Sequence, residues 1–131
     1  MINTGLYDYI DVLGKAADAS WLRNEVINNN IANVDTPNYK RKDVSFDDVL
    51  AIELKKTGST QVDLDYRVAG ADKRRLAGKI YTDSTAYSYR IDGNNVDIDT
   101  ENVELASNQI KYYGLVSSIN AEFNRIQSVI K

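Results

Sequence analysis

Long amphipathic patterns at the two ends of this 131-residue chain constrain its fold more than any other feature. Near the N-terminus, mostly apolar residues recur at alternating steps of four and three, which predicts one helix over about residues 4–33. The same spacing returns from Leu105 to Ile130, where six consecutive positions from Tyr112 onward are apolar or aromatic. We therefore expect a mainly α fold in which long N- and C-terminal helices pack as a coiled-coil-like pair.

The apolar residues of these two helices are expected to need more cover than one chain supplies. Trp21, Leu22 and Val26 lie off the first seam, and Ile110 and Tyr113 lie off the last. A helix with apolar residues on more than one side favours several neighbours. A self-contained helical hairpin that binds a soluble partner remains the alternative. We predict lateral association between copies through the seam residues Leu6, Ile10, Leu13, Ile27, Ile31, Tyr112, Val116, Ile119, Phe123, Ile126 and Ile130.

The residues that follow the first helix favour a defined turn. Asn33 and Thr36 have side chains that can bond to nearby backbone groups, and Pro37 cannot continue a helix. The chain is therefore expected to leave the helix at a fixed angle. The residues predicted to set this turn are Asn30, Asn33, Thr36, Pro37, Asn38 and Tyr39.

The middle of the chain is expected to be short of regular structure. A capping pattern and an apolar face predict a short helix over about residues 45–56. Apolar and polar residues then alternate over residues 61–68, which predicts a half-buried strand. Residues 69–79 are polar, basic and contain glycine, so we interpret them as a mobile loop, and residues 80–91 contain a second possible strand.

These patterns divide the chain into four segments. The two outer segments are the helices of the predicted pair, and the two inner ones connect them. The segments are the N-terminal helix over 1–33, the turn and short helix over 34–60, a small β-rich or loop segment over 61–98, and the C-terminal helix over 99–131.

Composition excludes several classes of function. The net charge of −3 and the pI near 4.9 argue against a nucleic-acid partner, which favours a basic surface. The two short basic runs, Lys40–Lys42 and Lys73–Arg75, are interpreted as solvated loops. The sequence lacks an apolar stretch long enough to span a membrane, and its start carries Asp8 and no basic run. We expect neither a signal peptide nor a membrane span.

Catalysis and metal binding find little support. Cysteine and histidine are absent, which removes the thiolate nucleophile, the usual general base and the commonest transition-metal ligands. Asp92, Asp97, Asp99 and Glu101 form an acidic cluster, but their spacing differs from that of a calcium loop, and Asp99 or Thr100 is instead expected to cap the last helix. We predict no metal, no cofactor and no catalytic residue. The rival is an enzyme that uses Asp97 and Asp99.

Two segments resemble a known family. Asn29–Lys40 resembles the N-terminal signature of the bacterial flagellar rod and hook family, in which a helix ends in Asn-Ile-Ala-Asn and Thr-Pro-Gly-Tyr follows. Gly93–Asp99 and Glu104–Tyr112 look like the C-terminal segment of the proximal rod proteins of that family. Asn38 stands where the family usually has glycine, and asparagine is the next most tolerant residue for a left-handed backbone.

The resemblance implies a structural, non-enzymatic subunit of the proximal rod of the flagellar basal body. It implies terminal helices that pack in a tubular core, with the middle segment facing outward or toward neighbours. The partners it implies are further copies of the chain, other rod proteins, the adaptor protein FliE and the export-gate proteins. It also implies a place in the periplasm-spanning rod, reached through the flagellar type III export apparatus. Two neighbouring proximal rod proteins of the family fit, and the short turn favours one of them.

Overall fold

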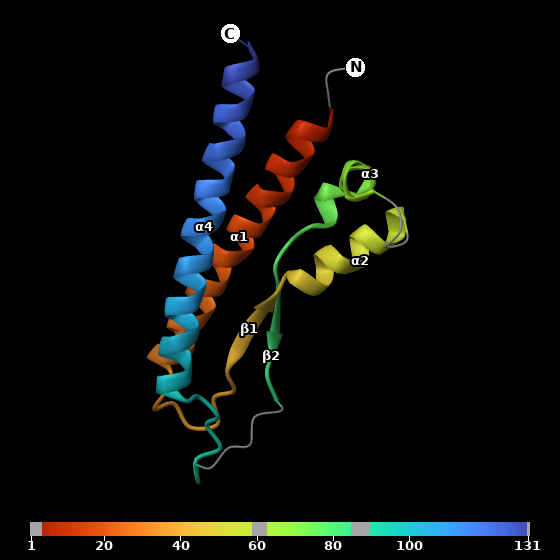
Figure 1. The fold of residues 1–131 in the computed structure, drawn as a ribbon. Coiled ribbons are helices and arrows are strands. Elements are labelled where there is room, and N and C mark those ends of the chain that lie inside the picture. The colour runs from red at the N-terminus through yellow and green to blue at the C-terminus, as the bar shows by residue number, and fades with distance from the viewer. Residues whose placement is uncertain (1–3, 59–62, 85–89, 131) are drawn as a thin grey trace.

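A pair of long antiparallel helices dominates the structure, a computed structural model that describes residues 4–58, 63–84 and 90–130 (Figure 1). α1 spans Thr4–Ala32 and α4 spans Ile98–Ile130. The chain descends along α1 and returns along α4, so that the start of α1 and the end of α4 lie at the same end of the pair (Figure 1). The predicted fold class and both predicted terminal helices are confirmed.

α4 begins slightly earlier than the sequence suggested. Asp97 Oδ1 accepts hydrogen bonds from the backbone N–H of Asp99 at 3.0 Å and of Thr100 at 3.4 Å. The Thr100 hydroxyl also donates to Asp97 Oδ2 at 3.1 Å. The cap is therefore Asp97, and the expected caps Asp99 and Thr100 are wrong, because both residues already lie in the first turn that Asp97 closes.

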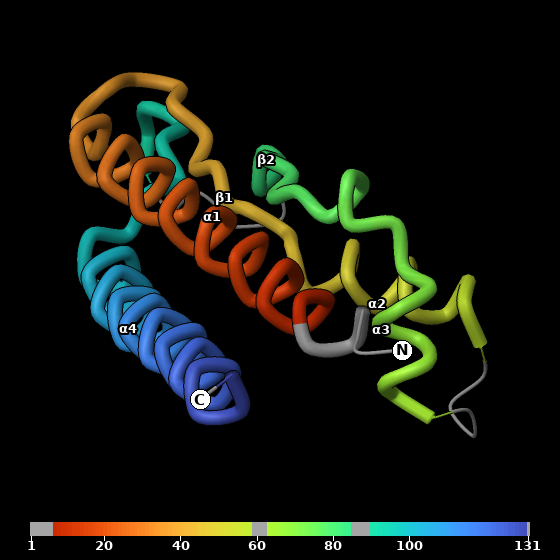
Figure 2. The backbone as a smooth tube through the Cα atoms, turned by 90° about the horizontal axis from the view of Figure 1, so that it is seen from above, coloured from red at the N-terminus to blue at the C-terminus, as the bar shows by residue number. Residues whose placement is uncertain are grey.

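The middle of the chain folds as a two-stranded sheet with a long helical connection (Figure 2). β1 (Lys42–Ser45) and β2 (Lys79–Thr82) pair antiparallel, with Asp43 opposite Tyr81. The predicted short helix over 45–56 is present as α2. The helical elements between the strands are α2 (Asp47–Thr57), α3 (Leu64–Gly70) and the 3-10 turn η1 (Lys73–Arg75).

A small apolar core joins this middle segment to one side of α1. Ala19, Phe46 and Leu76 form its buried centre, and Val12 packs against it. The backbone approaches closely here: a Cβ at Gly78 would lie 3.2 Å from the Ala19 Cβ. The segment between the two long helices therefore packs on α1 and leaves most of α4 uncovered.

The strand predicted over residues 61–68 is wrong. Where the structure describes this segment, it forms α3, and Asp63 caps that helix by accepting a hydrogen bond from the Asp65 N–H at 3.3 Å. The alternation does not mark a buried face, because Tyr66 is exposed while Val68 is buried. Among the described residues β1 pairs with β2, so residues 63–68 have no described strand beside them and instead pack as a helix on α1 and α2.

The loop predicted over residues 69–79 is also more ordered than expected. Leu76 is fully buried and Ala71 is buried, because η1 turns the chain back over α1. The second strand, predicted within 80–91, is confirmed only at its start, as β2. Ile91 is exposed beyond it, and residues 85–89 lie outside the described part of the chain.

Candidate functional site: the assembly helices and their polar framework

The turn after α1 is held by its own side chains. Asn33 Nδ2 donates to the Asn29 carbonyl at 2.7 Å, and the Thr36 hydroxyl donates to Asn33 Oδ1 at 3.0 Å. Asn38 has a φ of 61°, the left-handed conformation that the glycine usual in the family would adopt readily. The exposed Pro37 precedes it. These side-chain bonds act within the turn itself.

A second anchor comes from the far end of the chain. Asn94 is buried, and its Nδ2 lies 2.9 Å from the Asn33 carbonyl, 3.0 Å from that of Val34 and 2.8 Å from that of Thr36. One side-chain amide thus donates to backbone carbonyls of the turn that follows α1. The two segments that resembled one family in sequence therefore meet in space.

Asn38 and Gly93 meet at the same junction. Gly93 has a φ of 77°, and a Cβ built there would lie 2.7 Å from Asn38 Oδ1. The Asn38 N–H donates to the Asp92 carbonyl at 2.7 Å. Glycine is needed at position 93 for both its left-handed backbone and this close approach.

Asn30 links three elements and also bonds the chain where it leaves the turn. Its Oδ1 accepts from the Lys42 N–H at 2.9 Å and from the Tyr39 hydroxyl at 3.2 Å. Its Nδ2 donates to the Lys42 carbonyl at 2.7 Å and to Glu101 Oε2 at 3.1 Å. Burial raises the pKa of the Tyr39 phenol, and the Glu101 carboxylate raises it further. The fully buried amide of Asn30 therefore ties β1 and α4 to α1.

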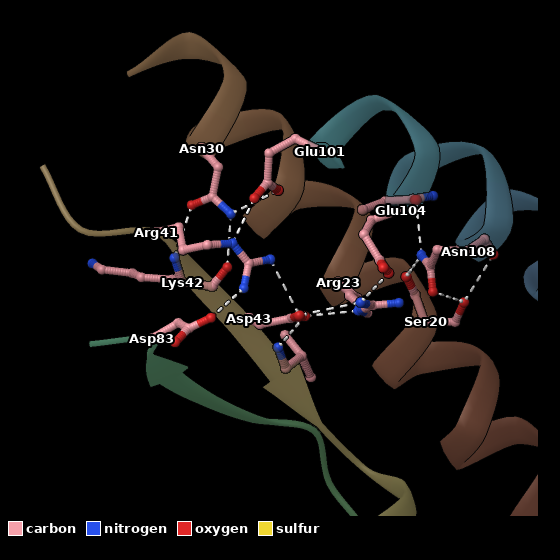
Figure 3. Close-up of polar contacts among 12 residues, drawn as sticks. Ser20, Arg23, Asn30, Arg41, Lys42, Asp43, Asp83, Glu101, Glu104 and Asn108 are labelled. Carbon is pink, nitrogen blue, oxygen red and sulfur yellow. Dashed lines mark hydrogen bonds and ion pairs between the residues drawn. The ribbon is translucent and has the colours of Figure 1, made fainter. Parts of the chain in front are cut away.

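Arg41 is the centre of an ion-pair cluster (Figure 3). Its Nε lies 2.5 Å from Glu101 Oε1, and its other nitrogens contact Asp83 at 2.8 Å and Asp43 at 3.3 Å. The Glu101 side chain is only 1% exposed. The solvated loop expected over Lys40–Lys42 is therefore wrong for Arg41, because the chain folds it between the sheet and α4.

Arg23 extends the cluster along α1 (Figure 3). Its Nε lies 2.7 Å from Asp43 Oδ1 and its NH2 lies 2.7 Å from Glu104 Oε2. Burial alone would raise the pKa of the Asp43 carboxyl, but the hydrogen bond from Arg23 and other partners outweigh it and hold that pKa below its ordinary value. Hydrogen bonds to the carboxylates of Asp43 and Glu104 likewise raise the pKa of Arg23. Asp43 of the sheet thus pairs with Arg23 of α1, and Arg23 in turn contacts Glu104 of α4.

A polar contact marks the middle of the helix pair. The buried Asn108 donates from Nδ2 to the Ser20 carbonyl at 2.7 Å and to Asn24 Oδ1 at 2.8 Å. The Ser20 hydroxyl donates to Asn108 Oδ1 at 3.0 Å. Polar groups buried in an otherwise apolar seam fix the register of two helices, since any slip would leave them without partners.

The predicted interface residues differ widely in burial within one chain. Ile27 is fully buried. Phe123 and Ile130 are 52% and 77% exposed, and the side chain of Leu6 lies outside the described part. The half-buried members are Ile10, Leu13, Ile31, Tyr112, Val116, Ile119 and Ile126. A single chain therefore closes the seam at the turn end of the pair and leaves it partly open toward the termini.

The outward side of α4 carries further exposed apolar groups. Val103, Ile110 and Tyr113 are among the most exposed large side chains of the described residues. Gly14 and Gly114 interrupt α1 and α4, yet a Cβ at either would meet no described atom within 4 Å. Glycine inside a helix costs about 1 kcal/mol relative to alanine. No contact within the described chain requires either glycine.

Other kinds of site receive no support from the geometry. The acidic residues at the start of α4 have structural roles, since Asp97 caps the helix and Glu101 pairs with Arg41. Among the described residues, no group of three or more potential ligands is placed to hold a metal ion. None of the described helices combines the length and the apolarity needed to cross a membrane.

Known proteins similar to the chain identify its family. A model of the family described as flagella basal body rod protein matches residues 10–40, which include most of α1 and the turn. The chain is similar to FlgB of Bacillus subtilis strain 168, with 41% identity over 92% of each chain. The chain belongs to the FlgB family of flagellar basal body rod proteins.

Two more distant FlgB relatives agree. FlgB of Borreliella burgdorferi is 35% identical over 94% of this chain and 90% of its own length. FlgB of Escherichia coli K12 is 33% identical over 83% of each chain. The alternative within the rod and hook family was the neighbouring proximal rod protein FlgC, and these relatives favour FlgB. FlgB family membership makes the chain a structural subunit of the flagellar basal body, assembled with other components of that body.

The residues that sequence reasoning missed in this FlgB family member are the polar ones that join distant elements. Arg41 was interpreted as part of a solvated loop and Glu101 as part of an acidic cluster at the start of the last helix, and Asp43 was assigned no role. Asn94 was placed in a segment that resembles the family, but no contact was predicted for it. The only available signal was the polar interruption of the first seam at Ser20 and at positions near it, which hinted at a buried polar partner.

Proposed function

We propose that copies of this chain build the rod by lateral packing of α1 and α4 against neighbouring subunits. The observation that carries this proposal is the partly open seam, in which Phe123 and Ile130 remain exposed although their positions follow the heptad pattern. Apolar side chains at seam positions are stabilised when a neighbouring helix covers them. The predicted seam residues of both helices would form this interface.

The bare outward side of α4 supports the same proposal. Val103, Ile110 and Tyr113 give it an apolar surface. Gly114 lies on the same helix, and a glycine allows a neighbouring backbone to approach closely. Contacts of this kind between non-equivalent surfaces do not close into a ring when a screw operation relates the copies, so they extend along an axis as a rod requires.

Several further parts of the proposal rest on family membership alone. The chain would act without catalysis, and its position would be the proximal part of the periplasm-spanning rod. It would leave the cytoplasm through the flagellar type III export apparatus. Its neighbours would include other rod proteins, the adaptor protein FliE and the export-gate proteins. The middle segment would face outward or toward neighbouring subunits.

Charged substitutions at the open end of the seam test the proposal. Phe123→Asp combined with Ile130→Asp should abolish rod assembly and motility in a strain that otherwise depends on this chain. Both side chains are exposed, so the isolated variant should keep the helical circular dichroism of the parent protein. The control, Asn120→Asp with Asn124→Asp, adds the same charge at other exposed positions of α4. It should still support rod assembly and motility, unless those positions also touch a neighbouring subunit.

Normal motility of the Phe123→Asp, Ile130→Asp variant would contradict the proposal. The rival, a self-contained helical hairpin that binds a soluble partner, predicts a cooperatively melting monomer that does not self-associate. Sedimentation of the purified full chain at rising concentration separates the two. The second rival is an enzyme that uses Asp97 and Asp99. It predicts that replacing these two residues abolishes turnover and leaves assembly unchanged.

A further inference from the structure

An aromatic cluster lies exposed across the two helices. The Trp21 and Tyr112 rings have centroids 5.8 Å apart, and Tyr113 continues the cluster 6.1 Å from Tyr112. Trp21 is 57% exposed and Tyr113 is 71% exposed. Tryptophan is highly buried on average, and exposed tryptophan and tyrosine together are typical of binding surfaces. Nothing in the described chain covers these rings further.

An acidic row runs beside the aromatic cluster on α1. Asp11, Asp18 and Glu25 are all exposed and follow one another at intervals of seven residues, about 10 Å along the helix. Trp21 stands three residues after Asp18 and four before Glu25, so both carboxylates are its neighbours on the helix surface. A flat aromatic face flanked by carboxylates suits a cationic side chain, and a guanidinium group above all.

The same chain presents such cations on another side. Arg74 and Arg75 of η1 are 91% and 63% exposed at their side chains, and both contact the single carboxylate of Asp72. Lys73 beside them pairs with Asp8. Two guanidinium groups that share one carboxylate leave a net positive charge at the surface. We call this exposed pair, Arg74 and Arg75, the cationic turn.

The two surfaces cannot meet within one molecule. Leu76, directly after η1, packs on α1 at Ala19, and Trp21 follows Ala19 by two residues, about 200° around the helix. The aromatic and acidic patch therefore faces away from the side that carries the cationic turn. Complementary surfaces on different sides of one chain make a heterologous contact, which repeats without closing when a screw operation relates the copies.

We infer that the patch formed by Asp18, Trp21, Glu25 and Tyr113 is a docking surface for the cationic turn of a second copy of this chain. Arg74 or Arg75 of that copy lies over the Trp21 ring and pairs with the flanking carboxylates. This inference rests on the proposed function, since it names a specific contact between neighbouring subunits. It adds a charged contact, made by the middle segment, to the apolar packing of the terminal helices.

A charge exchange tests the contact in cells. Arg74→Glu with Arg75→Glu places acids against the acidic patch, and Asp18→Arg with Glu25→Arg places bases against the cationic turn. Each double variant alone should reduce the number of complete basal bodies by about tenfold or more, because like charges then face one another. Co-expression of the two variants should restore assembly, since every contact between unlike variants again joins opposite charges.

The controls make each outcome decisive. Lys55→Glu with Lys79→Glu reverses two exposed cations elsewhere and should assemble as the parent chain does. Circular dichroism of each purified variant checks the fold. Assembly by both single-surface variants, or failure of folded variants to rescue each other, would overturn the docking contact while leaving the rod function intact. Failure of the parent chain itself to enter basal bodies would instead remove the proposed function.

A disulfide trap gives an independent readout. The chain has no cysteine, so Glu25→Cys with Arg75→Cys introduces the only two thiols. In basal bodies from a complemented strain, oxidation should link this variant into a ladder longer than dimers. Glu25→Cys with Lys55→Cys is the matched control and should form no ladder, because Lys55 lies outside the proposed contact. A Glu25→Cys, Arg75→Cys variant that assembles and forms no ladder would also overturn the contact.

Discussion

Arg41 Nε lies 2.5 Å from Glu101 Oε1, and this ion pair joins the segment before the sheet to the first turn of α4. The two residues are separated by 60 positions in sequence. Asn30 of α1 donates to the other oxygen of the same carboxylate at 3.1 Å. One buried acid thus holds α1, the segment before the sheet and α4 together.

Glu101→Gln should destabilise the isolated chain. The substitution keeps the shape of the side chain but leaves Arg41 without its closest carboxylate in a buried site. Breaking such a pair costs about 3 kcal/mol. Urea unfolding followed by circular dichroism measures the change. Asp11→Asn, on the exposed side of α1, is the matched control and should change stability by less than about 0.5 kcal/mol. Equal effects of the two changes would contradict this view of Glu101.

Asn94→Asp should weaken the junction between the turn and α4. The new carboxylate would face the carbonyls of Asn33, Val34 and Thr36, and its oxygens cannot donate to them. Loss of a buried donor to several acceptors costs about 2 kcal/mol. Asn102→Asp, at an exposed position of α4, should be nearly neutral. Thermal unfolding compares the two, and an unchanged midpoint for Asn94→Asp would refute the anchoring role.

Stability should fall in acid, partly through Asp43. The pKa of its carboxyl is lower in the folded chain than in the unfolded one, so the unfolded chain binds more protons as the pH falls. The stabilisation from this group is therefore fully present above about pH 4 and is lost below that value, as the pH approaches the lowered pKa. Asp43→Asn should flatten this part of the profile of unfolding free energy against pH. An identical slope in the variant would contradict the prediction.

Replacement by alanine should lower the stability of the chain at Gly78 and raise it at Gly14. A Cβ at Gly78 would lie 2.8 Å from Val44 Cγ1, so Gly78→Ala should destabilise the chain by about 1–3 kcal/mol through overpacking. Val44→Ala should relieve part of that loss in the double variant. Gly14→Ala meets open space in a helix and should stabilise the isolated chain by up to about 1 kcal/mol. Chemical denaturation of the parent chain, the three single variants and the double variant measures both effects.

Local patterns in the sequence were sufficient for the helices and the turn. Spacing of apolar residues at three and four positions is itself a property of a helix, so α1 and α4 could be predicted with ends close to those observed. Asn33, Thr36 and Asn38 act on neighbouring backbone, which is why the turn was also readable. The alternation over residues 61–68 led to a wrong prediction of a strand. A strand needs a partner, and the sequence alone does not show which strands pair.

The amino-acid sequence by itself determined two amphipathic helices, the turn that ends the first and the apolar side chains that lie on more than one side of each helix. Only the tertiary structure decided which charges are buried, because Arg41, Asp43 and Glu101 meet across long stretches of chain. It also decided that Trp21 and the cationic turn face different ways. Burial and long-range pairing depend on how elements pack, and the periodicity of a single segment carries no record of that packing.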